Sequence, residues 1–139
     1  MDELTREECL RLLAARPIGR LAVITADGLP MIVPVNYVLD GETVLFRTDV
    51  GTKVDGLRRH PVAFEVDDID ASERTGWSVL VQGIAHEVAP EEVGRAAVDP
   101  WAGGEKRQWV RIVPRSISGR RLTSEVMDRR PETGQSWDP

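Results

Sequence analysis

The segment over residues 43–61 carries the residue types and spacing of an anion-binding site. It starts with the pattern of a strand that ends in Arg47 and Thr48, breaks at a glycine, and restarts as a short helix with Thr52 as its N-cap and Lys53 in its first turn. The N-terminus of a helix presents free N–H groups and a positive dipole end, to which a lysine adds a full charge. We therefore expect a phosphate group to bind at Arg47, Thr48, Thr52 and Lys53.

This segment differs from the two best-known phosphate loops. It has neither the G-x-x-x-x-G-K-[ST] spacing of P-loop proteins nor the G-x-G-x-x-G pattern of Rossmann folds. An anion bound here is therefore held in a different way. The alternative interpretation is that Lys53 and Arg47 are ordinary solvated charges, because Gly-Thr-Lys after a strand is a common sequence.

A polar residue, Asn36, also stands inside the apolar strand pattern over residues 30–39. Pro34 in the same pattern cannot donate a ladder hydrogen bond, which predicts a sheet edge or a bulge at this point. The Asn36 amide needs partners in such surroundings. Either the backbone satisfies it or it binds a ligand, and the sequence leaves both interpretations open.

The elements that must position these residues are short strands joined by tight turns. A capping box over residues 5–8 predicts a helix over about 6–15 that covers one opening of the fold. Strands are expected over 21–25, 30–39, 43–48, 61–66, 76–87 and 108–113, with a further extended piece over 117–122. A polar loop over 67–74, a weak helix over 90–98 and a bulge at Gly83 complete the pattern.

Antiparallel pairs joined by two-residue turns predict a sandwich or a small barrel, and a closed or split barrel suits this length best. We therefore expect a mainly β fold with short flanking helices. One domain covers residues 1–122, and residues 123–139 form a polar C-terminal tail.

The composition limits the class of protein. The chain has 139 residues, a net charge of −5 and 41% hydrophobic residues, as expected of a globular domain whose affinity does not rest on neutralising nucleic-acid phosphates. No apolar run approaches the ~20 residues of a membrane span, and the lone Cys9 fits a small core residue. We expect a cytoplasmic protein. Two histidines and one cysteine make a zinc site of the usual kind unexpected.

Four pieces of sequence carry a family resemblance through their order and spacing: Cys-Leu-Arg-Leu-Leu with Ile-Gly-Arg-Leu-Ala-Val, Pro-Val-Asn-Tyr, Phe-Arg-Thr-Asp-Val-Gly-Thr-Lys, and Gly-Trp-Ser-Val-Leu-Val-Gln-Gly. With them the chain resembles the pyridoxamine 5'-phosphate oxidase-like flavin-binding proteins over about residues 4–122. The small bacterial flavin-nucleotide-binding group is the most similar. The resemblance implies an antiparallel split β-barrel of the FMN-binding type that forms a homodimer with the cofactor at the subunit interface.

The resemblance also implies which residues contact the cofactor. The second strand would lie along the flavin ring, the following strand end would hold the phosphate, and the long strand would reach the ring edge, often in the other subunit. A late tryptophan would flank the pocket. The residues implied in these roles are, in the same order, Val33, Pro34, Val35 and Asn36; Arg47, Thr48, Thr52 and Lys53; Trp77 and Ser78; and Trp109. For Trp77, plain core or interface packing is the alternative.

Two departures separate the chain from the vitamin oxidase itself. Only Lys53 stands where the oxidase has two adjacent cations, and no histidine follows His86, so the Arg-x-His of its substrate site is missing. Pyridoxamine phosphate oxidation is therefore not expected. Neither histidine is predicted to be a catalytic base, since His60 is placed at a helix end and His86 at a strand end near the surface.

The leading functional hypothesis is an FMN-dependent oxidoreductase that transfers hydride or electrons to a small organic acceptor, with no catalytic side chain identified. A deazaflavin-dependent reductase of the same fold and a non-catalytic flavin- or haem-binding module are the alternatives. An oligonucleotide-binding barrel is disfavoured by the net charge and by an aromatic content of 5%, because such barrels stack bases on exposed aromatic side chains.

Overall fold

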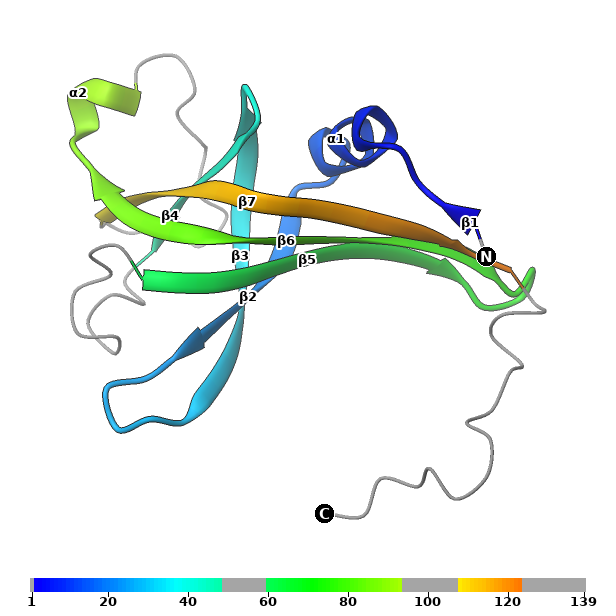
Figure 1. Ribbon diagram of the computed structural model, residues 1–139, viewed down its shortest axis with the longest axis horizontal. Helices are drawn as coiled ribbons and strands as arrows, with labels where there is room; N and C mark the ends of the chain where they lie inside the picture. Colours follow the sequence, from blue (N-terminus) through cyan, green and yellow to red (C-terminus); the bar gives the residue numbers. More distant parts are fainter. Residues whose placement is uncertain (1, 49–59, 94–107, 124–139) are drawn as a thin grey trace.

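The computed structural model describes residues 2–48, 60–93 and 108–123 (Figure 1). In this part of the chain, strands predominate and two short helices flank them. The elements are β1 (Asp2–Glu3), α1 (Arg6–Ala14), β2 (Ile18–Ile24), β3 (Pro30–Asp40), β4 (Thr43–Thr48), β5 (His60–Asp70), β6 (Thr75–Val88), α2 (Pro90–Val93) and β7 (Gln108–Leu122).

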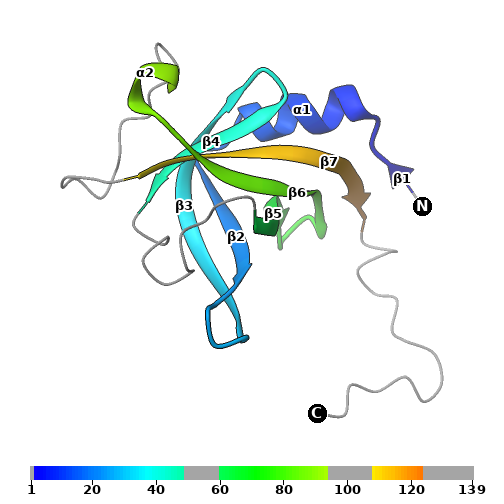
Figure 2. The ribbon, with the colours of Figure 1, turned by 60° about the vertical axis from the view of Figure 1, so that its left-hand side comes forward.

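The strands form one antiparallel sheet that closes on itself. Their order is β7-β4-β3-β2-β5-β6, and β6 pairs again with β7, while the short β1 adds to the outer side of β7. The β6–β7 ladder is long, running from Gly76 opposite Leu122 to Val88 opposite Trp109. The described residues thus confirm the predicted antiparallel barrel, which Figure 2 shows from a second side.

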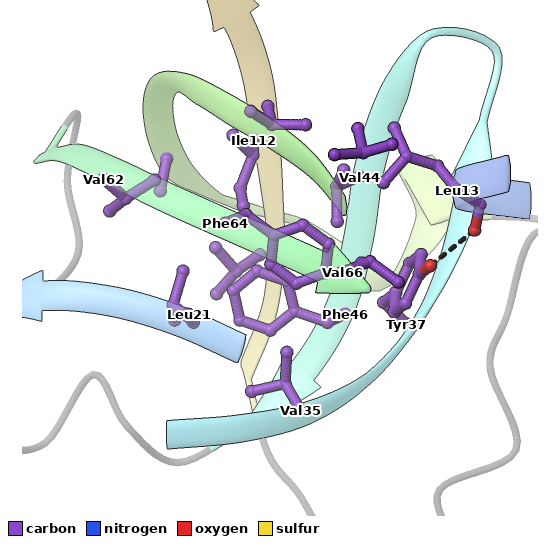
Figure 3. Packing of buried hydrophobic residues seen from close by; sticks show 14 of the residues in the cluster. Leu13, Leu21, Val35, Tyr37, Val44, Phe46, Val62, Phe64, Val66 and Ile112 are labelled. Atoms are coloured by element: carbon purple, nitrogen blue, oxygen red, sulfur yellow. Dashed lines mark hydrogen bonds between the residues drawn. The ribbon is translucent and has the colours of Figure 1, made fainter. Parts of the chain in front are cut away.

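The barrel interior is filled by alternate side chains of the strands. Tyr37 and Phe64 meet edge to face with ring centroids 4.9 Å apart, and Phe46 lies fully buried beside them (Figure 3). Gly19 makes room for this packing, because a Cβ atom there would lie 2.2 Å from Cζ of Phe64. The interior is therefore a packed apolar core, and polar chemistry is confined to the outer wall and the ends.

Helix α1 is anchored to this core, as predicted. Thr5 and Glu8 form the expected capping box, and Cys9 and Leu13 are fully buried in the core. The Leu13 carbonyl cannot find a helical partner four residues on, because Pro17 has no N–H. The Tyr37 hydroxyl donates to that carbonyl instead (Figure 3), and burial raises the pKa of Tyr37.

Two predictions about strands were wrong. Residues 67–70 were expected in a loop, but β5 continues to Asp70. Two arginines make this possible. Arg20 on the neighbouring β2 binds Glu65 and Asp67 at 2.7 and 2.9 Å, and Arg16, just before β2, binds Asp68 at 2.6 Å. The carboxylates are thereby compensated on the outer wall.

The extended pieces over 108–113 and 117–122 were expected to be separate, but they form the single strand β7. Pro114 interrupts the sequence pattern without ending the strand, because it lies opposite Gly83 at the register shift between Gln82 and Gly83. Arg115 is the extra residue of this bulge, where a missing N–H is tolerated. The bulge predicted at Gly83 is confirmed.

Several predicted features fall outside the described residues. They are the helix after residue 51 with Thr52 and Lys53, the second half of the helix predicted over 90–98, and the tail after Thr123. His60 does not end a helix in the described part of the chain, since it is the first residue of β5. The domain boundary at residue 122 coincides with the end of β7 and stays a prediction.

We expect Gly83→Ala to lower the free energy of unfolding by about 1–3 kcal/mol, the usual cost of overpacking. A Cβ atom at this position would lie 2.2 Å from the carbonyl oxygen of Val113, a backbone atom that cannot move without disturbing the β6–β7 ladder. Urea unfolding followed by far-UV circular dichroism measures the loss. The exposed neighbour substitution Gln82→Ala is the control and should stay within about 0.5 kcal/mol of the parent. Equal stability of both variants would contradict the tight closure.

Candidate functional site

The outer wall of the barrel brings together three of the residues predicted from sequence: Asn36 on β3, Arg47 on β4 and Trp109 on β7. Each is adjacent in its strand to a core residue, so the alternation of side chains turns it outward. Arg47 lies directly opposite Trp109, whose other neighbour is Val88 of β6. Asn36 and Arg47 both lie one residue beyond the last β3–β4 pair. Asn36, Arg47, Trp109 and Val88 are called the outer-wall row below.

Within this row Arg47 and Trp109 contact each other. The guanidinium carbon of Arg47 lies 5.3 Å from the centre of the Trp109 ring, which is the geometry of a cation–π contact. Both side chains are partly buried. The ring therefore limits the freedom of the guanidinium and keeps a positive charge at the end of β4.

Trp109 also borders a cavity of about 360 Å³ where β6 gives way to α2. This volume falls within the range of small-molecule sites, roughly 300–1,000 Å³. The described residues that line it come from the end of β6, the start of α2 and the start of β7: Glu87, Val88, Ala89, Pro90, Gln108 and Trp109.

Strand β3 has an open edge next to the row. Among the residues that the structure describes, the β3–β4 ladder stops at Tyr37 and the first half of β3 is paired with β2 alone. The Tyr37 N–H donates to the carbonyl of Pro17, just before β2. Successive residues of an antiparallel strand direct their N–H groups to opposite sides, so the N–H groups of Ile32 and Asn36 point away from β2. Pro34 lies between them with no N–H to satisfy. The edge predicted from Pro34 is confirmed within the described residues, where no strand pairs with residues 30–36 on this side.

Asn36 is only half satisfied by the protein. Its Nδ2 donates to the Pro17 carbonyl at 2.8 Å, while its Oδ1 is shielded from solvent and has no partner. An unpaired buried acceptor costs about 1–3 kcal/mol, which a ligand N–H could recover. The backbone thus satisfies the donor half of the amide, as one interpretation of the sequence held, while ligand binding by the acceptor half stays a prediction.

The other predicted residues lie in different positions. Val33 and Val35 direct their side chains into the core, so only their backbone could face a ligand, and Pro34 is exposed on the outer wall. Thr48 pairs with Gln108 in the β4–β7 ladder. Thr52 and Lys53 lie outside the described residues, so their part in the site stays a prediction.

Trp77 and Ser78 lie at the opposite end of β6 from the outer-wall row. Trp77 and Val88 are eleven positions apart in this strand, a path of up to about 36 Å at the rise of a β-strand. Arg16 lies 6.0 Å from the Trp77 ring and binds Asp68 there. A single chain therefore does not bring Trp77 and Ser78 to Asn36, Arg47 and Trp109.

Two further residues at the row's end of the barrel were not predicted to matter. His60 Nε2 and Gln108 Oε1 are shielded from solvent and have no hydrogen-bond partner. One feature of the sequence could have identified Gln108. It is a polar residue at the first inward position of a strand whose later inward residues are apolar. His60 had none, because its segment resembled the end of a helix.

The described residues contain no group of three or more His, Cys, Asp or Glu side chains that could hold a metal ion. Among the same residues no helix has the length and apolar character needed to cross a membrane.

Comparisons with known proteins agree on one family. The family model described as pyridoxamine 5'-phosphate oxidase matches residues 5–121. An uncharacterized protein of Mycobacterium tuberculosis (strain ATCC 25618 / H37Rv) is 39% identical over 132 residues, which is 88% of this chain and 86% of that protein.

Two solved structures are similar in both sequence and fold. The structure of the FAD binding protein from Mycobacterium smegmatis is 39% identical, with a TM-score of 0.72, and the match covers 88% of this chain and 98% of that one. A conserved protein of unknown function from Corynebacterium diphtheriae is 35% identical, with a TM-score of 0.69, and the match covers 87% and 96% of the two chains.

We expect Asn36→Ala to change the stability of the ligand-free protein by less than about 1 kcal/mol. The Pro17 carbonyl keeps its bond from the Tyr37 N–H, and the substitution removes an unpaired buried oxygen. Tyr37→Phe is the comparison, because it leaves the Leu13 carbonyl without a donor and should cost about 1–3 kcal/mol. Thermal melting of both variants measures the difference. A loss for Asn36→Ala as large as that for Tyr37→Phe would show that the amide is chiefly structural.

Proposed function

The chain belongs to the pyridoxamine 5'-phosphate oxidase-like family, and from that premise we propose that it binds a flavin nucleotide on the outer wall beside the open edge of β3. The observation that carries the proposal is the unpaired Oδ1 of Asn36 next to this edge. The polar rim of an isoalloxazine ring offers both donors and acceptors, which complement that oxygen and the free backbone groups of β3. The FAD-binding description of the M. smegmatis relative supports the same cofactor class.

The flavin phosphate is proposed to lie at the end of β4. Arg47 supplies a fixed positive charge there through its contact with Trp109, and Thr48, Thr52 and Lys53 complete the site expected from the sequence. This group is shared by FMN, which the sequence predicted, and by FAD, which contains FMN as one half. The proposal therefore concerns riboflavin 5'-phosphate, either free or as part of the dinucleotide.

The proposed activity is transfer of hydride or electrons to a small organic acceptor. A bound flavin supplies the redox chemistry, and the protein binds it, orients it and limits access of water. Asn36 would orient the ring edge and Arg47 the phosphate. A deazaflavin-dependent reductase or a non-catalytic flavin- or haem-binding module would use the same fold.

Release of the bound cofactor from purified protein and measurement of its mass is the experiment that tests this proposal. We expect FMN or FAD, together with a visible flavin absorption band. A deazaflavin would move the protein to the alternative reductase, and haem or no cofactor would reject the proposal. Turnover of a reduced nicotinamide or of a dye would then separate an oxidoreductase from a binding module.

We also propose a homodimer with the cofactor at the subunit interface. Within one chain Trp77 and Ser78 lie far from the outer-wall row, so a two-fold partner could supply them to it. The exposed Ile24, Leu29 and Ile32 on and around the β2–β3 hairpin, next to the open edge, offer apolar surface for such an interface. The single buried Cys9 fits the cytoplasm that we propose as the compartment.

Light scattering at micromolar concentration should give twice the 15.5 kDa mass of one chain. Ile32→Glu should shift the protein toward the monomer and weaken flavin binding together, because it places an unpaired charge on the proposed contact. Val113→Glu, on the outer wall of β7, is the control and should leave both properties unchanged. A wild-type protein with the mass of a single chain would end the dimer proposal.

The phosphate site predicts discrimination between FMN and riboflavin. Lys53→Ala should weaken FMN binding by about ten- to a hundredfold, because a charge-assisted contact contributes roughly 1.5–3 kcal/mol, and should leave riboflavin binding nearly unchanged. Arg47→Ala should act in the same direction. The exposed Arg115→Ala, at the bulge, is the matched control for charge.

Titration of both ligands, followed by flavin fluorescence, measures the two affinities. The loss should shrink at high salt, since a partly solvated charge is screened. If Lys53→Ala and Arg47→Ala weaken FMN and riboflavin equally, the phosphate does not bind at the end of β4.

A further inference from the structure

Arg16, Asp68 and Trp77 form a contact group at the end of the sheet opposite the outer-wall row. The guanidinium carbon of Arg16 lies 6.0 Å from the centre of the Trp77 ring, and its Nη2 donates to Asp68 Oδ2 at 2.6 Å. Asp68 lies directly opposite Trp77 in the β5–β6 ladder. One cation thus bridges the aromatic ring and the carboxylate across the strand from it. These three residues are called the Trp77 clamp below.

The backbone at Arg16 is anchored to β3. The carbonyl of Pro17, the next residue, accepts a hydrogen bond from Asn36 Nδ2 at 2.8 Å and another from the Tyr37 N–H at 3.1 Å. The Arg16 side chain therefore extends toward Trp77 from a fixed starting point. A guanidinium held at both ends in this way restricts the rotamers open to the ring that it contacts.

The Trp77 clamp contributes little to the stability of the fold. The side chains of Arg16 and Asp68 are 43% and 49% exposed, and ion pairs exposed to that degree stabilise proteins only slightly. Trp77 is half-buried and borders a cavity of about 450 Å³ at the β5–β6 hairpin, so part of its side chain can be reached from outside. The clamp thus orders an accessible aromatic side chain more than it holds the barrel together.

We propose that Arg16 is a positioning residue for the flavin bound by the partner subunit. In the proposed homodimer, Trp77 of one chain reaches the outer-wall row of the other, and Arg16 is bound to it. The flavin then meets a tryptophan that is already ordered, so less conformational freedom is lost on binding. This inference rests on the proposed flavin function and its homodimer, and adds to them a residue from the connection between α1 and β2.

Arg16 also lies next to a residue that contacts the site of its own chain. The Pro17 carbonyl binds Asn36, so a change at Arg16 has a second route, through the backbone, to the flavin of the same subunit. The side-chain contacts favour the partner's site, because Arg16 itself contacts Trp77 and Asp68. Dimers assembled from two different variants separate the two routes.

Titration of riboflavin and FMN into the flavin-free protein is the first test. Arg16→Ala should weaken both ligands alike by about two- to fivefold, the size of an exposed cation–π contact, and should barely change thermal melting. Arg16→Lys should recover most of the affinity, since its ammonium group keeps the positive charge. Arg6→Ala is the matched control, because it removes an equally exposed ion pair of 2.6 Å, to Glu42, and should change neither property.

Mixed dimers of Arg16→Ala and Arg47→Ala chains, purified through two different affinity tags, are the second test. If Arg16 acts on the partner's site, one site of the mixed dimer carries both substitutions and the other carries neither. Half of the sites should then bind FMN with wild-type affinity, although neither variant does so alone. Mixed dimers of Trp77→Ala and Arg47→Ala should restore half of the sites in the same way.

Asp68→Asn keeps the size of the side chain and removes the charge that binds Arg16, so it tests the Trp77 clamp even if Arg16→Ala fails to fold. It should weaken both flavins in the same direction. Absence of flavin binding in wild type would reject the proposed function itself. Wild-type affinity in both Arg16→Ala and Asp68→Asn, or mixed dimers without a wild-type site, would overturn the positioning role and leave flavin binding intact.

Discussion

The closing ladder between β6 and β7 is the constraint on which the rest of the structure depends. It joins the two ends of the sheet, so the residues of every barrel strand must alternate between a packed interior and an outer wall. The bulge at Gly83 lets the two long strands bend around that interior without losing their pairing elsewhere. Once the ladder is closed and the core is filled, a ligand of any size can bind only outside the barrel or at its ends.

Closure alone does not create a site, and the unequal lengths of β3 and the described part of β4 supply a candidate one. Strand β3 begins at Pro30, but the described β4 ends at Thr48, so the first half of β3 is paired on one side only. Pro34 makes this arrangement inexpensive because it has no N–H to leave unpaired on the open side. The residues just beyond the last β3–β4 pair, Asn36 and Arg47, are thus placed next to free backbone groups and turned away from the core.

Much of this architecture could be predicted from local sequence signals. Thr5 and Glu8 specified the start of α1, Gly83 the bulge and Pro34 the edge, because in each case the cause acts within a few residues of its effect. Pro114 misled for the opposite reason. Its missing N–H is tolerated only because Gly83, thirty-one residues earlier, lies opposite it, and periodicity within β7 cannot reveal that pairing.

The candidate site was less accessible to prediction because its parts meet through the register of distant strands. Trp77 and Trp109 look equivalent in sequence. Arg47 contacts Trp109 because the β4–β7 ladder places these two residues opposite each other. The family resemblance supplied the residues but not their grouping within one chain. The polar residue type of Gln108 at an inward position was its only signal in the sequence, because the unpaired state of its oxygen depends on which donors the folded chain fails to bring near it.

The described site is largely independent of what holds the barrel together. Arg47 and Trp109 contact each other on the outer wall, and Asn36 donates to a carbonyl that the Tyr37 N–H also satisfies. The fold is held instead by the core around Phe46 and Phe64 and by the bond between Tyr37 and Leu13. Substitutions on the wall can therefore change what binds there while the barrel remains intact, as expected where function resides in a site on a fold and not in the fold itself.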